Sequence, residues 1–110
     1  MKAQDRRAIE ASIAHWIRMR DDKGTPDEEP NAVCCPLCKL YFDKSCIGCP
    51  IFTKTGADLC RGTPYEAAHA AWESHYCTSP KTEERHKLWR TTANAMIRFL
   101  RSLLPRKAKP

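Results

Sequence analysis

The sequence predicts a mainly α-helical fold built around a small loop-rich centre. Two observations predict it: amphipathic patterns occupy both ends of the 110-residue chain, and six of its seven cysteines fall within residues 33–60. The length suits a single domain. We expect an N-terminal helix over residues 1–20, an acidic linker over 21–33, cysteine-rich loops over 34–62, a short helix over 63–77, a longer helix over 79–104 and a basic tail over 105–110.

The helix at each end is predicted from an apolar stripe at helical spacing. In the last helix, Leu88 and Trp89 begin an apolar face that opposes a basic one. We expect both helices to be amphipathic and to pack together over the loops, with a core of Ile9, Ile13, Trp16, Ile17, Trp72, Met96, Phe99 and Leu103.

Start signals delimit the two C-terminal helices. Thr63 is the expected N-cap of the short helix, with Pro64 in its first turn and Glu66 completing a capping box. Ser79 and Pro80 are the expected start of the longer helix. No convincing strand is found beyond short pieces around residues 39–42 and 49–52.

The aliphatic core is small for a chain of this length. Leu, Ile, Val and Phe make up 17 of 110 residues, and the formal net charge is +6. Chains of such composition need disulfides, a metal or a partner to fold. The first twenty residues carry charges throughout, unlike a secretory signal, so we expect a soluble protein of the reducing cytoplasm, with reduced cysteines and no membrane association.

The cysteine spacing is typical of a zinc site. Cys35 and Cys38 form one C-x2-C pair, Cys46 and Cys49 form another, and Cys60 follows. Four thiolates complete the tetrahedron that zinc prefers in structural sites. We expect a zinc knuckle with four cysteine ligands drawn from these five residues, with Cys35, Cys38 and Cys49 the safest members.

Other interpretations of the cysteines stay open. An iron–sulfur cluster is the alternative cofactor, since Cys49 precedes a proline, as the last ligand does in ferredoxins. Disulfides or unligated thiols come next. His69 is a possible extra ligand, although a histidine beside Trp72 is more often a core residue, and Cys77 is expected to be a small buried side chain.

No pattern of catalytic residues stands out. The chain has no nucleophile elbow, no phosphate-binding glycine loop and no H-E-x-x-H sequence. Zinc bound by four thiolates also leaves no position open for a reacting water. We therefore expect a protein that is not an enzyme and has no small-molecule substrate, with a zinc-framed nuclease as a minor alternative.

The last third of the chain is the basic part, with nine basic and two acidic groups in residues 78–110. This face can dock on an acidic protein partner, which is the favoured function, or contact the phosphates of nucleic acid without sequence specificity. The plainest alternative is a solvated face that provides solubility. The candidate contact residues are Lys87, Arg90, Asn94, Arg98, Arg101, Arg106 and Lys107.

Part of the sequence is similar to a known group of proteins. The order Cys35-Pro36-Leu37-Cys38, Cys46-Ile47-Gly48-Cys49-Pro50, Thr55-Gly56, Cys60 and Thr63-Pro64-Tyr65 resembles small cysteine-rich proteins of bacteriophages and prophages. The resemblance covers about 40 residues and implies a metal site. By analogy it also implies a phage accessory protein in the bacterial cytoplasm that binds or inhibits a host machine for defence or nucleic-acid handling.

Overall fold

The computed structural model describes residues 1–23, 29–30, 35–41, 44, 46–57, 60–77 and 82–105. The described residues are mainly helical and include no strand. In chain order the helices are α1 (Ala3–Arg20), α2 (Pro36–Tyr41), α3 (Pro50–Thr55), α4 (Tyr65–Tyr76) and α5 (Glu83–Ser102). The radius of gyration of 14.3 Å is close to the ~13 Å of a compact domain of this size.

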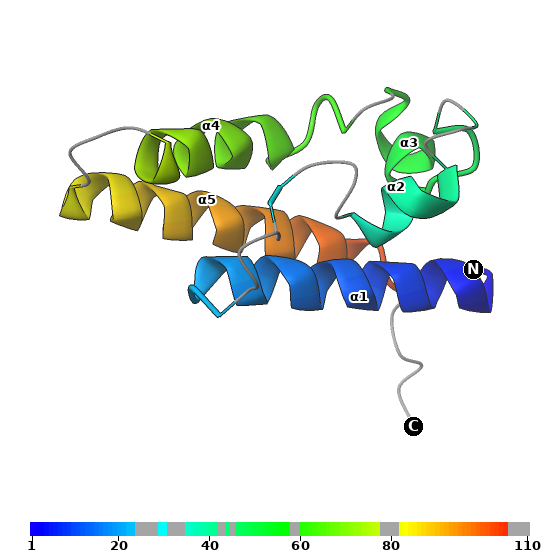
Figure 1. Ribbon diagram of the computed structural model, residues 1–110. Helices are drawn as coiled ribbons and strands as arrows, with labels where there is room; N and C mark the ends of the chain where they lie inside the picture. Colours follow the sequence, from blue (N-terminus) through cyan, green and yellow to red (C-terminus); the bar gives the residue numbers. More distant parts are fainter. Residues whose placement is uncertain are drawn as a thin grey trace.

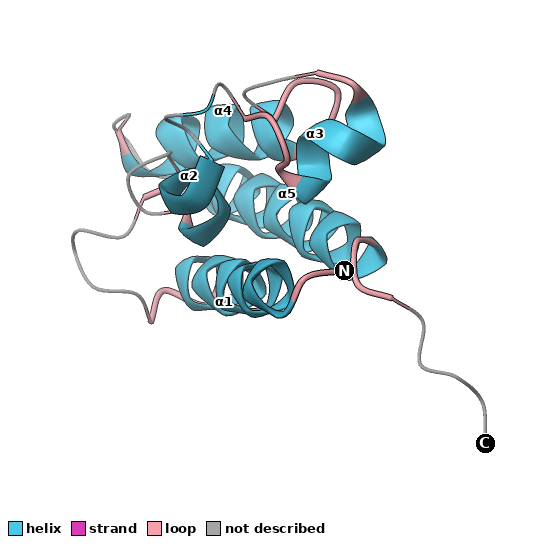
Figure 2. Ribbon diagram, turned by 90° about the vertical axis from the view of Figure 1, so that its right-hand side faces the viewer, coloured by secondary structure: helices cyan, strands magenta, loops and turns pink. Residues whose placement is uncertain are grey.

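Three long helices form the frame of the molecule. Helix α5 lies between α1 and α4 and packs against both, and it runs antiparallel to α1 (Figure 1). The short helices α2 and α3 lie at the end of this frame where α1 begins and α5 ends, with α2 against α1 (Figures 1 and 2). The cysteine segment is therefore held at one end of the helical frame.

The helix boundaries follow the predictions closely at the N-terminus and less closely elsewhere. The predicted N-terminal helix is confirmed as α1. Helix α4 begins at Tyr65 rather than Thr63, and the Thr63 hydroxyl accepts a hydrogen bond from the Tyr65 amide at 3.1 Å. Helix α5 begins at Glu83, and Thr82 is its N-cap because the Thr82 hydroxyl accepts from the Arg85 amide. The predicted start at Ser79 and Pro80 lies outside the described residues.

The expectation of loops over residues 34–62 is wrong at two places. Residues 36–41 and 50–55 are the helices α2 and α3, and these include residues 39–41 and 50–52 of the short pieces that resembled strands. Both helices begin with a proline directly after a cysteine, and proline at the first helical position fixes a backbone angle that suits a helix. The Cys-Pro pattern therefore marks a helix start at both places.

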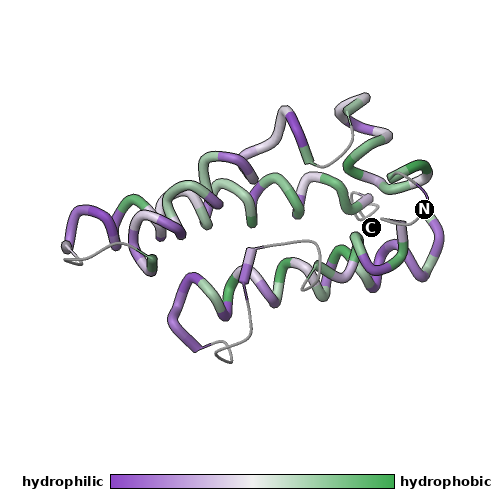
Figure 3. Tube along the Cα trace, turned by 45° about the horizontal axis from the view of Figure 1, so that its top comes forward, coloured by the Kyte–Doolittle hydropathy of each residue, from purple (hydrophilic) through white to green (hydrophobic). Residues whose placement is uncertain are grey.

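The core is made of large side chains from the frame. Of the predicted core, Ile9, Trp16 and Met96 are buried, and Ile13, Ile17, Trp72, Phe99 and Leu103 are partly buried against it. Figure 3 shows apolar and polar residues alternating along the long helices, as one buried face requires. Among the described residues, no helix is both long and apolar enough to cross a membrane.

The buried face of α5 differs from the predicted one. Leu88 is 54% exposed, whereas Trp89 is fully buried. Because α5 packs against helices on two sides, its buried stripe is wide and is turned away from Leu88. This stripe consists of Trp89, Ala93, Met96, Ile97 and Leu100.

Candidate metal centre

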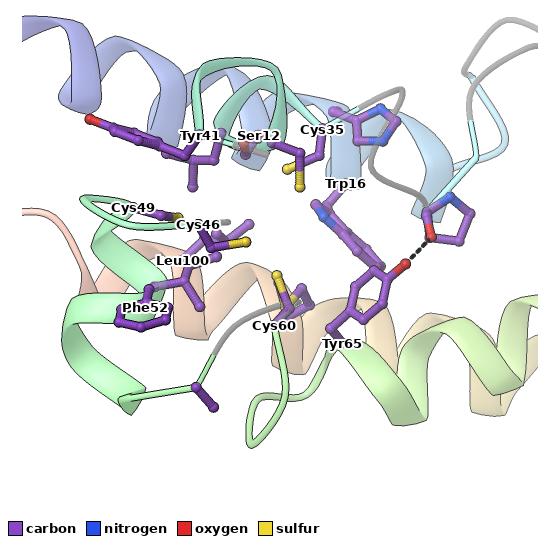
Figure 4. A pocket seen from close by; sticks show the side chains of 17 residues that line it. Ser12, Trp16, Cys35, Tyr41, Cys46, Cys49, Phe52, Cys60, Tyr65 and Leu100 are labelled. Carbon is purple, nitrogen blue, oxygen red and sulfur yellow. Dashed lines mark hydrogen bonds between the residues drawn. The ribbon is translucent and has the colours of Figure 1, made fainter. Parts of the chain in front are cut away.

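All five candidate cysteines line one cavity of about 220 Å³. They come from four places in the chain: the first turn of α2, the turn before α3, the start of α3 and the segment before α4. Figure 4 shows the labelled Cys35, Cys46 and Cys60 with their sulfur atoms directed into the same space. The structure therefore gathers the residues that the spacing singled out: Cys35, Cys38, Cys46, Cys49 and Cys60.

Cys35 sits directly before Pro36, where α2 begins. Its sulfur interacts with the thiol of Cys38 and accepts hydrogen bonds from the backbone amides of Cys38 and Leu37. The Cys38 thiol and these amides lower the pKa of Cys35 to about 6, against the opposing effect of burial. The same thiol contact raises the pKa of Cys38, and burial adds to it. Within the pair, the contact therefore favours the ionised form of Cys35 and the protonated form of Cys38.

Cys49 repeats this construction at the start of α3. It is the N-cap residue before Pro50, and the backbone amides of Ile51 and Phe52 favour its thiolate, which lowers its pKa. Burial nevertheless raises the pKa of Cys49, so these amides only partly offset the loss of water. In each short helix a buried aliphatic side chain, Leu37 or Ile51, anchors the turn that carries the cysteine.

Cys46 and Cys60 have an uncommon backbone conformation. Their φ angles are +66° and +60°, in the left-handed region that residues with a side chain rarely adopt. Such conformations persist where the surrounding structure requires them, and they concentrate at functional sites. The Cys46 amide donates to the Tyr41 carbonyl at 2.9 Å and the Cys46 carbonyl accepts from the Cys49 amide at 3.0 Å, so the turn is fixed on both sides.

The thiols influence one another across the cavity. Burial raises the pKa of Cys60 to about 12, and the charges of Cys35, Cys49 and Cys46 add to this rise. Five thiolates in one buried space repel one another, so a cation is needed before most of them can ionise. A metal ion bound there would supply that charge and release the protons.

Within the part of the chain that the structure describes, no three His, Cys, Asp or Glu side chains are close enough to hold one metal ion. A single zinc with four sulfurs at about 2.3 Å would require the thiols to converge further.

The rest of the cavity is largely apolar, with a few polar groups at its edge. Ser12 is 1% exposed, and its hydroxyl favours the Cys35 thiolate although no hydrogen bond of ordinary length joins it to a described residue. His15 is buried, with Nε2 3.2 Å from the Glu29 carbonyl oxygen. The Tyr65 hydroxyl donates to the Pro30 carbonyl at 2.7 Å (Figure 4).

Sequence reasoning missed these polar groups. Ser12 and His15 both lie on the buried side of α1, where they were taken for part of an amphipathic helix. The one available signal was that two polar residues fall on the same side as Ile9 and Trp16.

Two further predictions concern residues near the cavity. His69 is not among the residues that line it: its Nδ1 is 2.9 Å from the Glu73 carboxylate, and its ring stacks between Tyr65 and Trp72. The expected role of Cys77 as a buried side chain is wrong, because Cys77 is exposed at the end of α4, whose buried face turns toward α5.

The predicted basic face is exposed at most of its described positions. Lys87, Arg90, Arg98 and Arg101 are all exposed along α5. Asn94 is half-buried, and its Oδ1 accepts a hydrogen bond from the Arg20 guanidinium at 2.9 Å, which links α5 to α1. Arg106 and Lys107 lie outside the described residues.

A second polar cluster lies at the opposite end of the frame. Asp22 accepts hydrogen bonds from the Tyr76 hydroxyl and from His86, whose Nε2 is 3.2 Å from the carboxylate. The ring of His75 stacks on that of His86 at 4.5 Å. This cluster joins the end of α1 to α4 and α5.

Comparison with known proteins adds no relative to these observations. No family model matches the chain, and neither the curated proteins nor the solved structures give a match.

Proposed function

We propose that this chain is a non-enzymatic binding protein whose cysteine centre is a structural metal site. The observation that carries the proposal is the convergence of five cysteines from four places in the chain on one cavity. Two of them are buried and three are partly buried. A metal held there would tie α2, α3 and the segment before α4 to the helical frame.

The surroundings of the cysteines favour a structural role over a catalytic one. Most of the other side chains at the cavity are apolar, among them Leu37, Ile51, Phe52, Met96 and Leu100. A metal bound by thiolates in such a setting has no position open for a substrate when four ligands surround it. A partner would then contact the outer faces of the helices.

The outward face of α5 is the proposed contact surface. It presents Lys87, Arg90, Arg98 and Arg101 along a helix of 20 residues, which spans about 30 Å. Leu88, 54% exposed, adds an apolar side chain beside Lys87. A surface that combines positive charge with an apolar residue suits an acidic protein better than bare phosphates. The resemblance to phage proteins directs the search for this partner to host machines.

Nonspecific nucleic-acid binding is the second candidate function, and the length of the exposed basic face favours it. Lysine and arginine side chains along one helix can follow a phosphate backbone. Such binding weakens steeply with salt, whereas an interface with an apolar centre tolerates salt better.

The proposal is tested by reversing charge on α5. In the variant that combines Arg90→Glu, Arg98→Glu and Arg101→Glu, the free energy of unfolding should stay within about 0.5 kcal/mol of the wild-type value, since exposed substitutions rarely cost more. It should lose binding to the host protein that copurifies with the wild type after nuclease treatment. Lysine at the same three positions is the matched control, because it keeps the charge and should keep the binding.

Leu88→Ala separates the two candidates. It should weaken a protein complex and leave binding to random-sequence duplex DNA unchanged. If the glutamate variant binds as the wild type does, the basic face only provides solubility. If binding disappears with nuclease treatment and falls steeply with salt, the target is nucleic acid.

A further inference from the structure

The line of contact between α1 and α5 forms a face of its own, which we call the seam. Arg20 ends α1, and its guanidinium donates to Asn94 Oδ1 at 2.9 Å near the middle of α5. Because the two helices run antiparallel, this bond sets which positions lie opposite each other along the seam (Figure 1). Helices α2, α3 and α4 lie on the other side of the α1–α5 pair, so no described helix covers the seam (Figure 2).

The α1 side of the seam is apolar in its middle. Ile13 and Ile17 precede Arg20 by seven and three residues, a spacing that places all three side chains on the same side of a helix. Both isoleucines are half-buried, so each packs against the core and still reaches the surface. They give a partner an apolar surface of two side chains one helical turn apart.

The arginines on this side of α1 are balanced by neighbouring carboxylates. Arg6 Nε lies 3.1 Å from the Glu10 carboxylate, one turn along the helix. Arg20 donates to both carboxylate oxygens of Asp21, at 2.8 and 3.0 Å. The α1 side of the seam therefore carries little net charge.

The α5 side of the seam is positively charged. Arg90, Asn94, Arg98 and Arg101 recur at intervals of three or four residues, so they share the side of α5 on which Asn94 meets α1. The three arginines are exposed, and within the described ranges none of them forms an ion pair with a carboxylate. A molecule in the seam would meet isoleucine on one side and uncompensated arginine on the other.

We propose that the seam binds an amphipathic helix of a partner protein, with its apolar residues on Ile13 and Ile17 and its carboxylates on the one flank that meets the arginines of α5. The groove between two packed helices accepts a third helix, whose side-chain rows interdigitate with theirs. Ile13 and Ile17 lie about 6 Å apart along α1, which matches apolar anchors one turn apart on a docked helix.

The apolar middle of the seam favours such a helix over nucleic acid, because a phosphate backbone buries no isoleucine. This inference rests on the proposed function and names the chemistry of the partner.

The test uses a designed helical peptide of about 18 residues, or five turns, with leucine at every third or fourth position and glutamates along one flank. A control peptide has lysine in place of each glutamate. By fluorescence anisotropy the full chain should bind the glutamate peptide at least about tenfold more tightly, and the NMR signals of α1 and α5 should shift more than those of α4. Equal affinity for both peptides, or shifts confined to other helices, overturns the proposal.

Charge reversal locates the binding of the glutamate peptide. Arg98→Glu should weaken it about tenfold, because like charges would then face each other. Arg7→Glu is the matched control, since Arg7 is exposed on α1 but does not share the spacing of Ile13 and Ile17. Equal loss of affinity in the two variants shows a general attraction of opposite charges and overturns the seam.

Ile17→Ala tests the apolar half of the seam and should weaken the glutamate peptide about tenfold, as loss of an interface anchor does. Unchanged affinity overturns the proposal. Where circular dichroism shows that this variant has lost helicity, Arg98→Glu and Arg7→Glu decide, because both change exposed residues.

The host protein that copurifies with the chain separates this inference from the proposed function. If the triple glutamate variant of α5 loses that protein while Ile17→Ala keeps it, the binding function stands and the seam is overturned. If both variants keep it, both proposals fail. Two further results overturn the partner helix: duplex DNA that binds Ile17→Ala as tightly as the wild type and displaces the peptide, and a dimer of the chain that Ile17→Ala dissociates.

Discussion

In the frame of α1, α4 and α5, large side chains fill the interior, with Trp89, Ile9, Ile97 and Leu100 almost fully buried. In the cysteine segment, residues 35–60, the two helices have six residues each, and the residues between them include left-handed Cys46 and Gly48. Helices this short are not stable alone in water. The frame has the means to fold by apolar burial, whereas under the proposed function the cysteine segment would depend on a bound metal.

The largest effect is expected from removal of the proposed metal from the cysteine segment. Thiolate metal sites contribute on the order of 10 kcal/mol to folding, so chelation should lower the free energy of unfolding by several kcal/mol. In hydrogen exchange, amides of residues 46–57 should lose protection first, and those of α1 and α5 should keep more. Restoring the metal is the control. Equal loss of protection throughout would show that the two regions do not differ.

The second largest effect is expected from creating a cavity in the helical frame. Trp89→Ala should cost about 3–5 kcal/mol, the usual range for removing a buried aromatic side chain. Leu88→Ala is the matched control at the neighbouring position and should change stability by less than about 0.5 kcal/mol, since Leu88 is exposed. Urea unfolding of both variants measures the difference. Similar losses of stability in the two variants would contradict the observation that Trp89 is buried and Leu88 is exposed.

A smaller effect is expected at the turn before α3. Gly48 has a φ of +90°, and a Cβ there would lie 3.1 Å from Cε1 of Tyr41. Gly48→Ala should therefore cost more than the ~1–2 kcal/mol of a left-handed alanine alone.

Gly62→Ala provides the control for this turn. Gly62 also has a positive φ, of +79°, but a Cβ there would meet no atom within 4 Å. It should show only the backbone cost in thermal unfolding. If the two glycine variants melt alike, the contact with Tyr41 is not restrictive.

The smallest expected effect is a pH dependence at the far end of the frame. Burial and the hydrogen bond to Asp22 raise the pKa of Tyr76 above its ordinary value. The unfolded tyrosine ionises at about pH 10, so the stability from this group is present below pH 10 and is lost as the pH rises toward the folded-state pKa. Tyr76→Phe should lessen the fall in melting temperature between pH 9 and 11. If the melting temperature of the variant falls as much as that of the wild type, other groups cause the fall.

Much of the helical architecture could be predicted because it depends on local patterns. The stripe that includes Ile9 and Trp16 gave α1 its boundaries, since an amphipathic repeat and a terminal break act within a few residues. The buried face of α5 could not be predicted in this way. Which side of a helix is buried depends on how many neighbours it packs against, and α5 has neighbours on two sides.

The candidate site, too, could be predicted only in part from the sequence. The spacing of five cysteines indicated a shared centre, because C-x2-C pairs direct two thiols toward one point. The contact between the Cys35 and Cys38 thiols, the left-handed backbone of Cys60 and the buried Ser12 hydroxyl appear only in three dimensions.

By itself the sequence determined the three long helices, the identity of the thiols and the basic side of α5, since each is encoded by residues close together in the chain. The tertiary structure decided that the five thiols line one cavity and which side of α5 is buried. Both depend on contacts between segments far apart in sequence: α1 supplies Ser12 to the cavity, α5 supplies Met96 and Leu100, and the segment before α4 supplies Cys60. Local periodicity carries no information on how such distant segments fit together.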